Sequence, residues 1–110
     1  MVELTKEVWD EVVLTSEHPV LVEVYSSTCM PCKMLGKVLE GIEQENLNLR
    51  IVKLNATTLS EIPAINNLNI NSVPTLVLVT AKKLQILPKM FQKSDILSEV
   101  FRLVEEEQNE

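Results

Sequence analysis

The 110-residue chain is long enough for one compact domain, which we expect to span residues 1–110, and its 45% hydrophobic and 24% charged content argues against long disorder. Its net charge of −6 argues against nucleic acid or an anionic membrane surface as a partner. Apolar runs such as Val73–Val79 are too short to cross a bilayer, and residues 1–11 lack the pattern of a signal peptide, so we expect a cytoplasmic protein.

The first expected element is a short helix that Thr5 caps and that His18 and Pro19 terminate. Its apolar side chains recur at helical spacing, at Val8, Trp9, Val12 and Val13. The run Val20–Ser26 follows. Because this run is rich in β-branched residues and bounded by turn residues, it indicates a buried strand.

From Pro31 to Asn46 the hydrophobic period becomes helical, and Pro31 suits a first helical turn, where its missing N–H is not needed. The apolar side of this helix is formed by Met34, Leu35, Val38, Leu39 and Ile42. A second strand is expected over Leu49–Ala56. A short irregular helix is expected over Ser60–Leu68, with Pro63 near its start.

Two further strands, Pro74–Thr80 and the weaker Lys82–Pro88, lie close enough in the chain to form a hairpin. Ser94 is expected to cap a last helix, and the acidic residues 105–110 to fray into solvent. The side chains expected to face inward are Ile96, Leu97, Val100, Phe101 and Val104. Because the earlier strand–helix–strand unit requires parallel pairing, we expect an α/β fold with a mixed sheet covered by helices on both faces.

The only two cysteines, Cys29 and Cys32, lie where the first long strand gives way to a helix. Residues three apart on a helix lie roughly 5–6 Å from each other, within the range that a disulfide accepts. Unpaired N–H groups and the helix dipole stabilise a thiolate at this end, so Cys29 should be the more exposed and more acidic thiol. In a reducing compartment such a pair is more often catalytic or metal-binding than a structural disulfide.

These positions predict a two-step exchange in which Cys29 attacks a partner's disulfide and Cys32 then attacks Cys29 to release the reduced partner. Cys32 needs a group that takes its proton. Glu23 shares a strand face with Leu21 and Tyr25, and burial would raise its pKa into a range suited to that transfer. A solvated Glu23 is the alternative, and Lys53 on the neighbouring strand is a candidate partner for it.

A zinc half-site is the main alternative for the cysteine pair. A structural zinc needs four ligands, and only His18 remains as a further ligand of the usual kind, so we expect no metal.

The stretch VEVYSSTCMPCKML, followed by IVKLN and by NINSVPTLVLV, resembles the thioredoxin family over nearly the whole chain and in the same order. The resemblance implies a thioredoxin-like fold, with a central four- to five-stranded sheet and a dithiol at a helix start. It also implies that Pro74 is cis and faces the cysteines, and that the Val73 backbone pairs with an extended substrate. Met30, Pro31, Val73 and Pro74 are then the substrate-binding residues, with Cys29, Cys32 and Glu23 catalytic.

The implied function is a dithiol–disulfide oxidoreductase that reduces disulfides in protein partners and serves electron transport and cell redox homeostasis. It implies a redox-active disulfide with no cofactor, and NADPH enters only through a thioredoxin-reductase-type enzyme that recharges the dithiol. We expect a monomer.

The chain departs from the family at several positions. Thr28 replaces a tryptophan, Met30 replaces a glycine between the cysteines, Glu23 replaces an aspartate, and Lys82 and Met90 align with glycines. Met30 is either part of an apolar docking surface or a neutral replacement. The departures leave two alternatives open: a binding adaptor with little redox activity, and a more oxidising thiol oxidase or isomerase.

Overall fold

The computed structural model describes residues 1–45 and 47–110, and it contains a mixed five-stranded sheet in the order β1-β3-β2-β4-β5. The strands are β1 (Val2–Glu3), β2 (Val20–Tyr25), β3 (Arg50–Asn55), β4 (Thr75–Val79) and β5 (Leu84–Ile86). β3 runs parallel to β1 and to β2, whereas β4 is antiparallel to β2, and β5 to β4. The expected mixed sheet and final hairpin are confirmed. β1 was not predicted, because two residues are too few to show a period.

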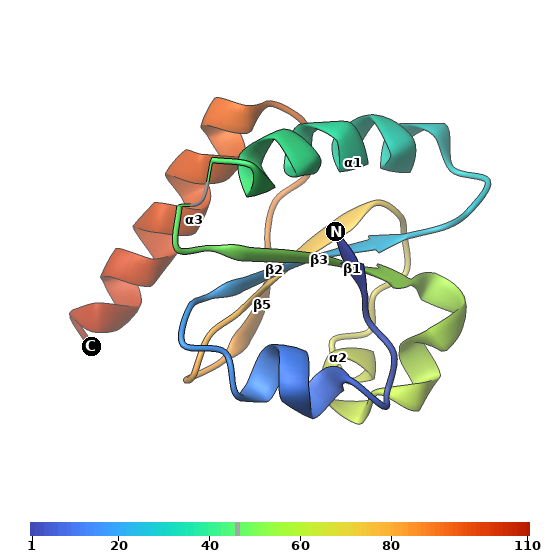
Figure 1. Cartoon of the computed structure of the whole chain (residues 1–110), viewed down its shortest axis with the longest axis horizontal. Coiled ribbons are helices and arrows are strands. Elements are labelled where there is room, and N and C mark those ends of the chain that lie inside the picture. Colours follow the sequence, from blue (N-terminus) through green and yellow to red (C-terminus); the bar gives the residue numbers. More distant parts are fainter. Residues whose placement is uncertain (46) are drawn as a thin grey trace.

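Helices cover both faces of this sheet (Figure 1). One face carries α1 (Met30–Glu43) and α3 (Lys93–Gln108). The other carries a π-helical segment, η1 (Asp10–Leu14), a 3-10 segment, η2 (Ala56–Glu61), and the short α2 (Pro63–Asn66). The expected α/β class is confirmed. Within residues 1–45 and 47–110, no helix has both the length and the apolar character needed to cross a bilayer.

β2 lies in the middle of the sheet, and its alternating side chains enter two different cores. Val20, Val22 and Val24 pack toward η1 and α2, whereas Leu21 packs beneath α1 and α3. Glu23 lies on the same side of β2 as Leu21 and is only 2% exposed. Covering both faces of this strand therefore buries a carboxyl group, as the surrounding apolar run predicted.

The expected cap at Thr5 is wrong. Leu4 still donates its N–H to the Lys53 carbonyl (2.7 Å), so the chain leaves the sheet at Thr5 and turns before it becomes helical. η1 begins only at Asp10, after Trp9.

The expected cap at Ser94 is also wrong, because α3 begins at Lys93 and Gln92 occupies the cap position with an extended backbone. At the other boundary in question, α1 ends at Glu43. Asn46, where we expected that helix to end, lies outside the described residues.

The acidic tail is more ordered than its sequence predicted, since α3 continues to Gln108. Glu107 is 8% exposed and accepts a hydrogen bond from the hydroxyl of Thr80 (2.6 Å). Its backbone carbonyl accepts another from Nζ of Lys82 (2.9 Å). These contacts hold the last turn of α3 against the turn between β4 and β5, so the fraying expected from residue 105 onward is wrong for residues 105–108.

Two side chains expected to face inward instead face solvent: Met34 on α1 and Phe101 on α3. Successive residues of a helix point about 100° apart around its axis. A residue next to a buried position can therefore lie outside the buried side of the helix and face solvent. The buried sides are narrower than expected. They consist of Cys32, Leu35, Gly36, Leu39 and Ile42 on α1, and of Ile96, Val100 and Glu107 on α3.

Candidate active site

The cysteines lie at the junction between β2 and α1, where the strand pattern ends and the helix pattern begins. Cys29 occupies the cap position with an extended backbone, and Pro31 and Cys32 form the first turn of α1. The two sulfur atoms form a disulfide, and the Cα atoms of the pair are 5.2 Å apart. This agrees with the spacing that the sequence predicted for residues three apart.

The two cysteines differ in environment as expected. Cys29 is half-buried, whereas Cys32 is only 3% exposed. The sulfur of Cys29 accepts the backbone N–H of Cys32 at 3.2 Å, and the first turn of α1 contains no acidic residue. When the disulfide is reduced, this N–H and the helix dipole favour negative charge on Cys29. The more exposed sulfur is therefore the one whose thiolate the backbone stabilises.

Glu23 lies below α1 on the central strand. Burial raises the pKa of Glu23 to about 7, while the positive charge of Lys53 lowers it and the negative charge of Glu40 raises it. Its Oε2 atom is inaccessible and has no hydrogen-bond partner among the described residues. A carboxyl group with a pKa near neutrality can both accept and release a proton at physiological pH.

Glu23 and Cys32 line the same cavity, which has a volume of about 400 Å³. Its walls come from Met1, β2, β3, α1 and the loop before α1. The lining residues that matter here are Glu23, Cys32, Lys33, Gly36, Lys37 and Lys53. The structure therefore brings the expected acid and Cys32 to one space, with Lys53 beside them.

Lys53 is placed by strand register. It pairs with Glu23 across β2 and β3, and its Nζ lies 5.5 Å from the centre of the Tyr25 ring. The Tyr25 hydroxyl donates a hydrogen bond to Glu3, and burial together with that bond raises the pKa of Tyr25 to about 12. Glu3 also accepts the N–H of Asn55 (3.1 Å). Sequence reasoning missed Glu3 because it missed β1.

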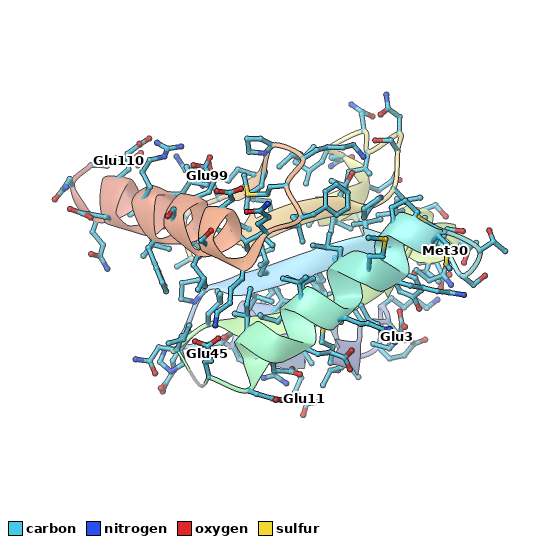
Figure 2. All side chains as sticks on the ribbon, turned by 90° about the horizontal axis from the view of Figure 1, so that it is seen from above. Glu3, Glu11, Met30, Glu45, Glu99 and Glu110 are labelled. Carbon is cyan, nitrogen blue, oxygen red and sulfur yellow. A yellow bond between two sulfur atoms is a disulfide. The ribbon has the colours of Figure 1, made fainter. Side chains whose placement is uncertain are left out.

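The expected substrate-binding residues lie at the same end of the sheet as the cysteines. Met30 is 68% exposed at the start of α1 (Figure 2), and Pro31 is exposed beside it. The Val73–Pro74 peptide is cis, as the resemblance implied. Thr75, the next residue, pairs with Val24 near the end of β2. Their role in binding stays a prediction.

The structure adds Lys89 to this region. Its Nζ donates a hydrogen bond to the Pro74 carbonyl (3.0 Å), which ties the segment after β5 to the cis peptide. A cavity of about 150 Å³ lies between these two segments, and Pro74, Lys89, Met90 and Phe91 are among its lining residues. No pattern in the sequence pointed to Lys89, because the contact joins two irregular segments.

His18 precedes β2, whereas the cysteines follow it, so the strand separates the residues of the alternative zinc site. Among the described residues, no three His, Cys, Asp or Glu side chains are grouped so that they could hold a metal ion.

A family model described as Thioredoxin matches residues 1–101. The chain belongs to the thioredoxin family. The cysteine pair at the start of α1 fits the Cys-x-x-Cys site of this family, whose members are dithiol–disulfide oxidoreductases. The expected fold and enzyme class are therefore confirmed.

Named relatives agree with this assignment. A thioredoxin of Rickettsia bellii is 34% identical over 76 residues, which cover 68% of this chain and 70% of the relative. A thioredoxin of Mycobacterium tuberculosis is 42% identical over 67 residues, or 60% of this chain and 56% of the relative. A bifunctional thioredoxin reductase/thioredoxin of Mycobacterium leprae is 40% identical over 60% of this chain, which is 14% of the relative. The matched segment thus spans less than two thirds of some of these relatives.

Proposed function

We propose that this thioredoxin-family chain reduces disulfide bonds in protein partners through the Cys29–Cys32 couple. The observation that supports this most is the asymmetry of the pair. The partly exposed Cys29 sits at the positive end of α1, and the nearly inaccessible Cys32 lies one turn behind it and lines the same cavity as a buried acid.

The reaction uses the reduced form of the pair. The Cys29 thiolate attacks one sulfur of the partner's disulfide, so a mixed S–S bond forms, the partner's bond breaks, and the first partner thiolate leaves and takes a proton. Cys32 then attacks Cys29, which breaks the mixed bond and releases the second partner thiol. Two electrons pass to the partner, and the chain retains the Cys29–Cys32 disulfide.

In this proposal Glu23 accepts the proton of Cys32 before the second step. The cavity that both residues line gives the proton a route between them, and a pKa near 7 lets the carboxylate take it up and later return it to water. The positive charge of Lys53 opposes the effect of burial and lowers the pKa of Glu23.

Met30, Pro31, Val73 and Pro74 form the surface on which an extended partner segment is proposed to lie. Their positions support this proposal. Met30 and Pro31 directly follow Cys29 in the sequence, and Val73 and Pro74 directly precede β4, whose first residue pairs with Val24 of β2. The exposed Met30 favours an apolar partner residue next to the disulfide.

A separate reductase is proposed to recharge the disulfide, with NADPH consumed only by that enzyme. The Mycobacterium leprae relative, whose name joins a thioredoxin reductase to a thioredoxin, supports this pairing. A monomeric, cytoplasmic protein that contributes to electron transport and redox homeostasis completes the proposal. A lone cysteine pair with unequal environments suits a reducing compartment.

The test is the reduction of insulin disulfides with dithiothreitol as the electron source. The wild type is expected to accelerate precipitation of the insulin chains well above the dithiothreitol background, and Cys29→Ser to remove the acceleration. A wild type that does no better than Cys29→Ser would overturn the proposal and favour a binding role.

A further inference from the structure

Gly36 is a buried glycine inside α1, four residues after Cys32 and therefore one turn below it. Glycine weakens a helix interior relative to alanine, so a helix of this kind has a local reason to avoid it. The only other glycine, Gly41, lies in the same helix but is exposed, and a Cβ there would meet nothing within 4 Å. Gly36 is therefore the glycine whose surroundings could explain the missing side chain.

Gly36 lies next to the buried carboxyl group of Glu23. A Cβ placed on Gly36 would lie 3.4 Å from Oε1 of Glu23 and 3.9 Å from the terminal methyl of Met1. Such a methyl group would fit in ordinary contact, but it would occupy the space in front of the carboxyl oxygen. Gly36 and Glu23 also line the same cavity as Cys32. The absent side chain thus leaves Oε1 facing this space.

We propose that Gly36 is a positioning residue for the Cys32 proton transfer: its missing side chain keeps the Glu23 carboxyl in contact with the cavity beside Cys32. This inference rests on the proposed function. Water in that space solvates the ionised carboxylate and carries its proton away. Glu23 is longer than the aspartate that the family has at this position, and Gly36 has no side chain, so the two residues are complementary in size.

The cavity lets us name the charges that act on this carboxyl from each element. Of these, Lys53 on β3 lowers the pKa of Glu23 and Glu40 on α1 raises it. The other titratable groups that line the cavity are Tyr25 on β2, Cys32, Lys33 and Lys37 on α1, and the amine of Met1, which pairs with Glu43. β4 presents the apolar Leu76 opposite Glu23. Gly36→Ala alters none of these charges, so a change in the pKa of Glu23 would not come from a changed charge around it.

Gly36→Ala is therefore expected to raise the pKa of Glu23 further, because a methyl group in place of water disfavours the charged form. The carboxyl pKa is measured by NMR titration in the oxidised proteins, where the cysteines do not titrate. We expect an increase of roughly half a pH unit or more for Gly36→Ala and none for the matched control Gly41→Ala. Equal Glu23 pKa values in wild type and Gly36→Ala would overturn the proposal.

A double-mutant cycle with Glu23→Asp provides the second test. The shorter aspartate withdraws from position 36, so adding the methyl should shift its pKa much less than it shifts that of Glu23. An equal shift on both backgrounds would mean that the methyl acts through the helix rather than on the carboxyl, and would overturn the proposal.

The pH profile of insulin reduction connects the geometry to the reaction. Glu23 must be ionised to accept the Cys32 proton, so a higher pKa moves the rise in rate to higher pH. Gly36→Ala should move this rise by the same interval as the pKa, whereas Gly41→Ala should not. A shifted pKa with an unmoved profile would overturn the role in proton transfer. A wild type without insulin reduction would refute the proposed function but leave the titration interpretable.

Discussion

The two faces of the sheet share the same central strand but bury different chemistry. Toward η1 and α2, β2 contributes Val20, Val22 and Val24 to a uniformly apolar core. Toward α1, the same strand contributes Leu21 and then Glu23, and Glu23 lines a cavity together with Cys32 of α1. The first face can be packed for stability alone. The second carries an ionisable group whose burial opposes its charge, so stability and reactivity are in conflict only there.

The largest effect is expected for the reaction at the α1 face of the sheet. Cys32→Ser keeps the attacking thiol but removes the group that resolves the mixed disulfide, so the chain should remain covalently attached to its partner. Non-reducing gel electrophoresis after incubation with an oxidised protein should show this adduct. Cys29→Ser serves as the control and should form none. An equal adduct in both variants would contradict the assigned order of attack.

The next effect compares packing on the two faces. Leu54→Ala, in the apolar core below η1 and α2, should lower the free energy of unfolding by about 2–5 kcal/mol while leaving the reduction potential unchanged. Leu35→Ala, one turn from Cys32 on the other face, should cost a similar amount and also change the potential. Denaturant unfolding and redox titration measure both quantities. Equal changes of potential would mean that the faces are not independent.

Glu23→Gln tests the conflict between stability and reactivity. The pKa of Glu23 is about 7 in the folded chain, whereas the ordinary pKa of 4.5 applies in the unfolded chain. The free energy of unfolding should therefore fall as the pH rises between these two values. The loss should be complete above pH 7 and on the order of 3 kcal/mol. Glu23→Gln should remove this pH dependence, so the variant should be more stable than the wild type at pH 8. Its rate of insulin reduction at pH 7 should be lower than that of the wild type by a factor of roughly ten or more.

Unfolding of the oxidised proteins at pH 4, 6 and 8 provides the measurement. A wild type whose stability does not fall between pH 4 and 8 would contradict the burial of an ionisable Glu23.

The smallest effect concerns the end of α3, away from either core. Thr80→Val removes the hydrogen bond to the buried Glu107 carboxylate and should lower the free energy of unfolding by about 1–2 kcal/mol. The rate of insulin reduction should not change, because the contact lies at the β4–β5 turn. A lowered rate at unchanged stability would place this turn in the reaction surface.

The sequence was sufficient for the parts of the fold whose period is long. β2, β3 and α1 could be predicted because apolar residues repeat over several turns or pleats, and the buried Glu23 followed from a strand that is apolar on both sides. The cysteine pair followed from its place at a strand–helix junction. Each of these patterns is formed by residues that are close together in the sequence, so the sequence alone shows it.

Contacts between distant segments could not be predicted in this way. Glu3 reaches Tyr25 only because the short β1 joins the sheet, and Glu107 is buried only because α3 continues past the point where its acidic residues suggest solvent. Gly36 carries no signal until it is known that Glu23 lies beneath α1 at this position. The cis isomer at Pro74 came from the resemblance, because X-Pro bonds in folded proteins are cis in only about 5–6% of cases.

The most direct test of the central claim is a redox titration of the Cys29–Cys32 couple against glutathione buffers. The claim predicts one reversible two-electron transition, with a tenfold change in the redox ratio per roughly 30 mV and a midpoint below about −220 mV, as a reductant of protein disulfides requires. A reversible midpoint near −120 mV would instead indicate an oxidant or isomerase. Cysteines that do not titrate reversibly would contradict a redox centre at the start of α1.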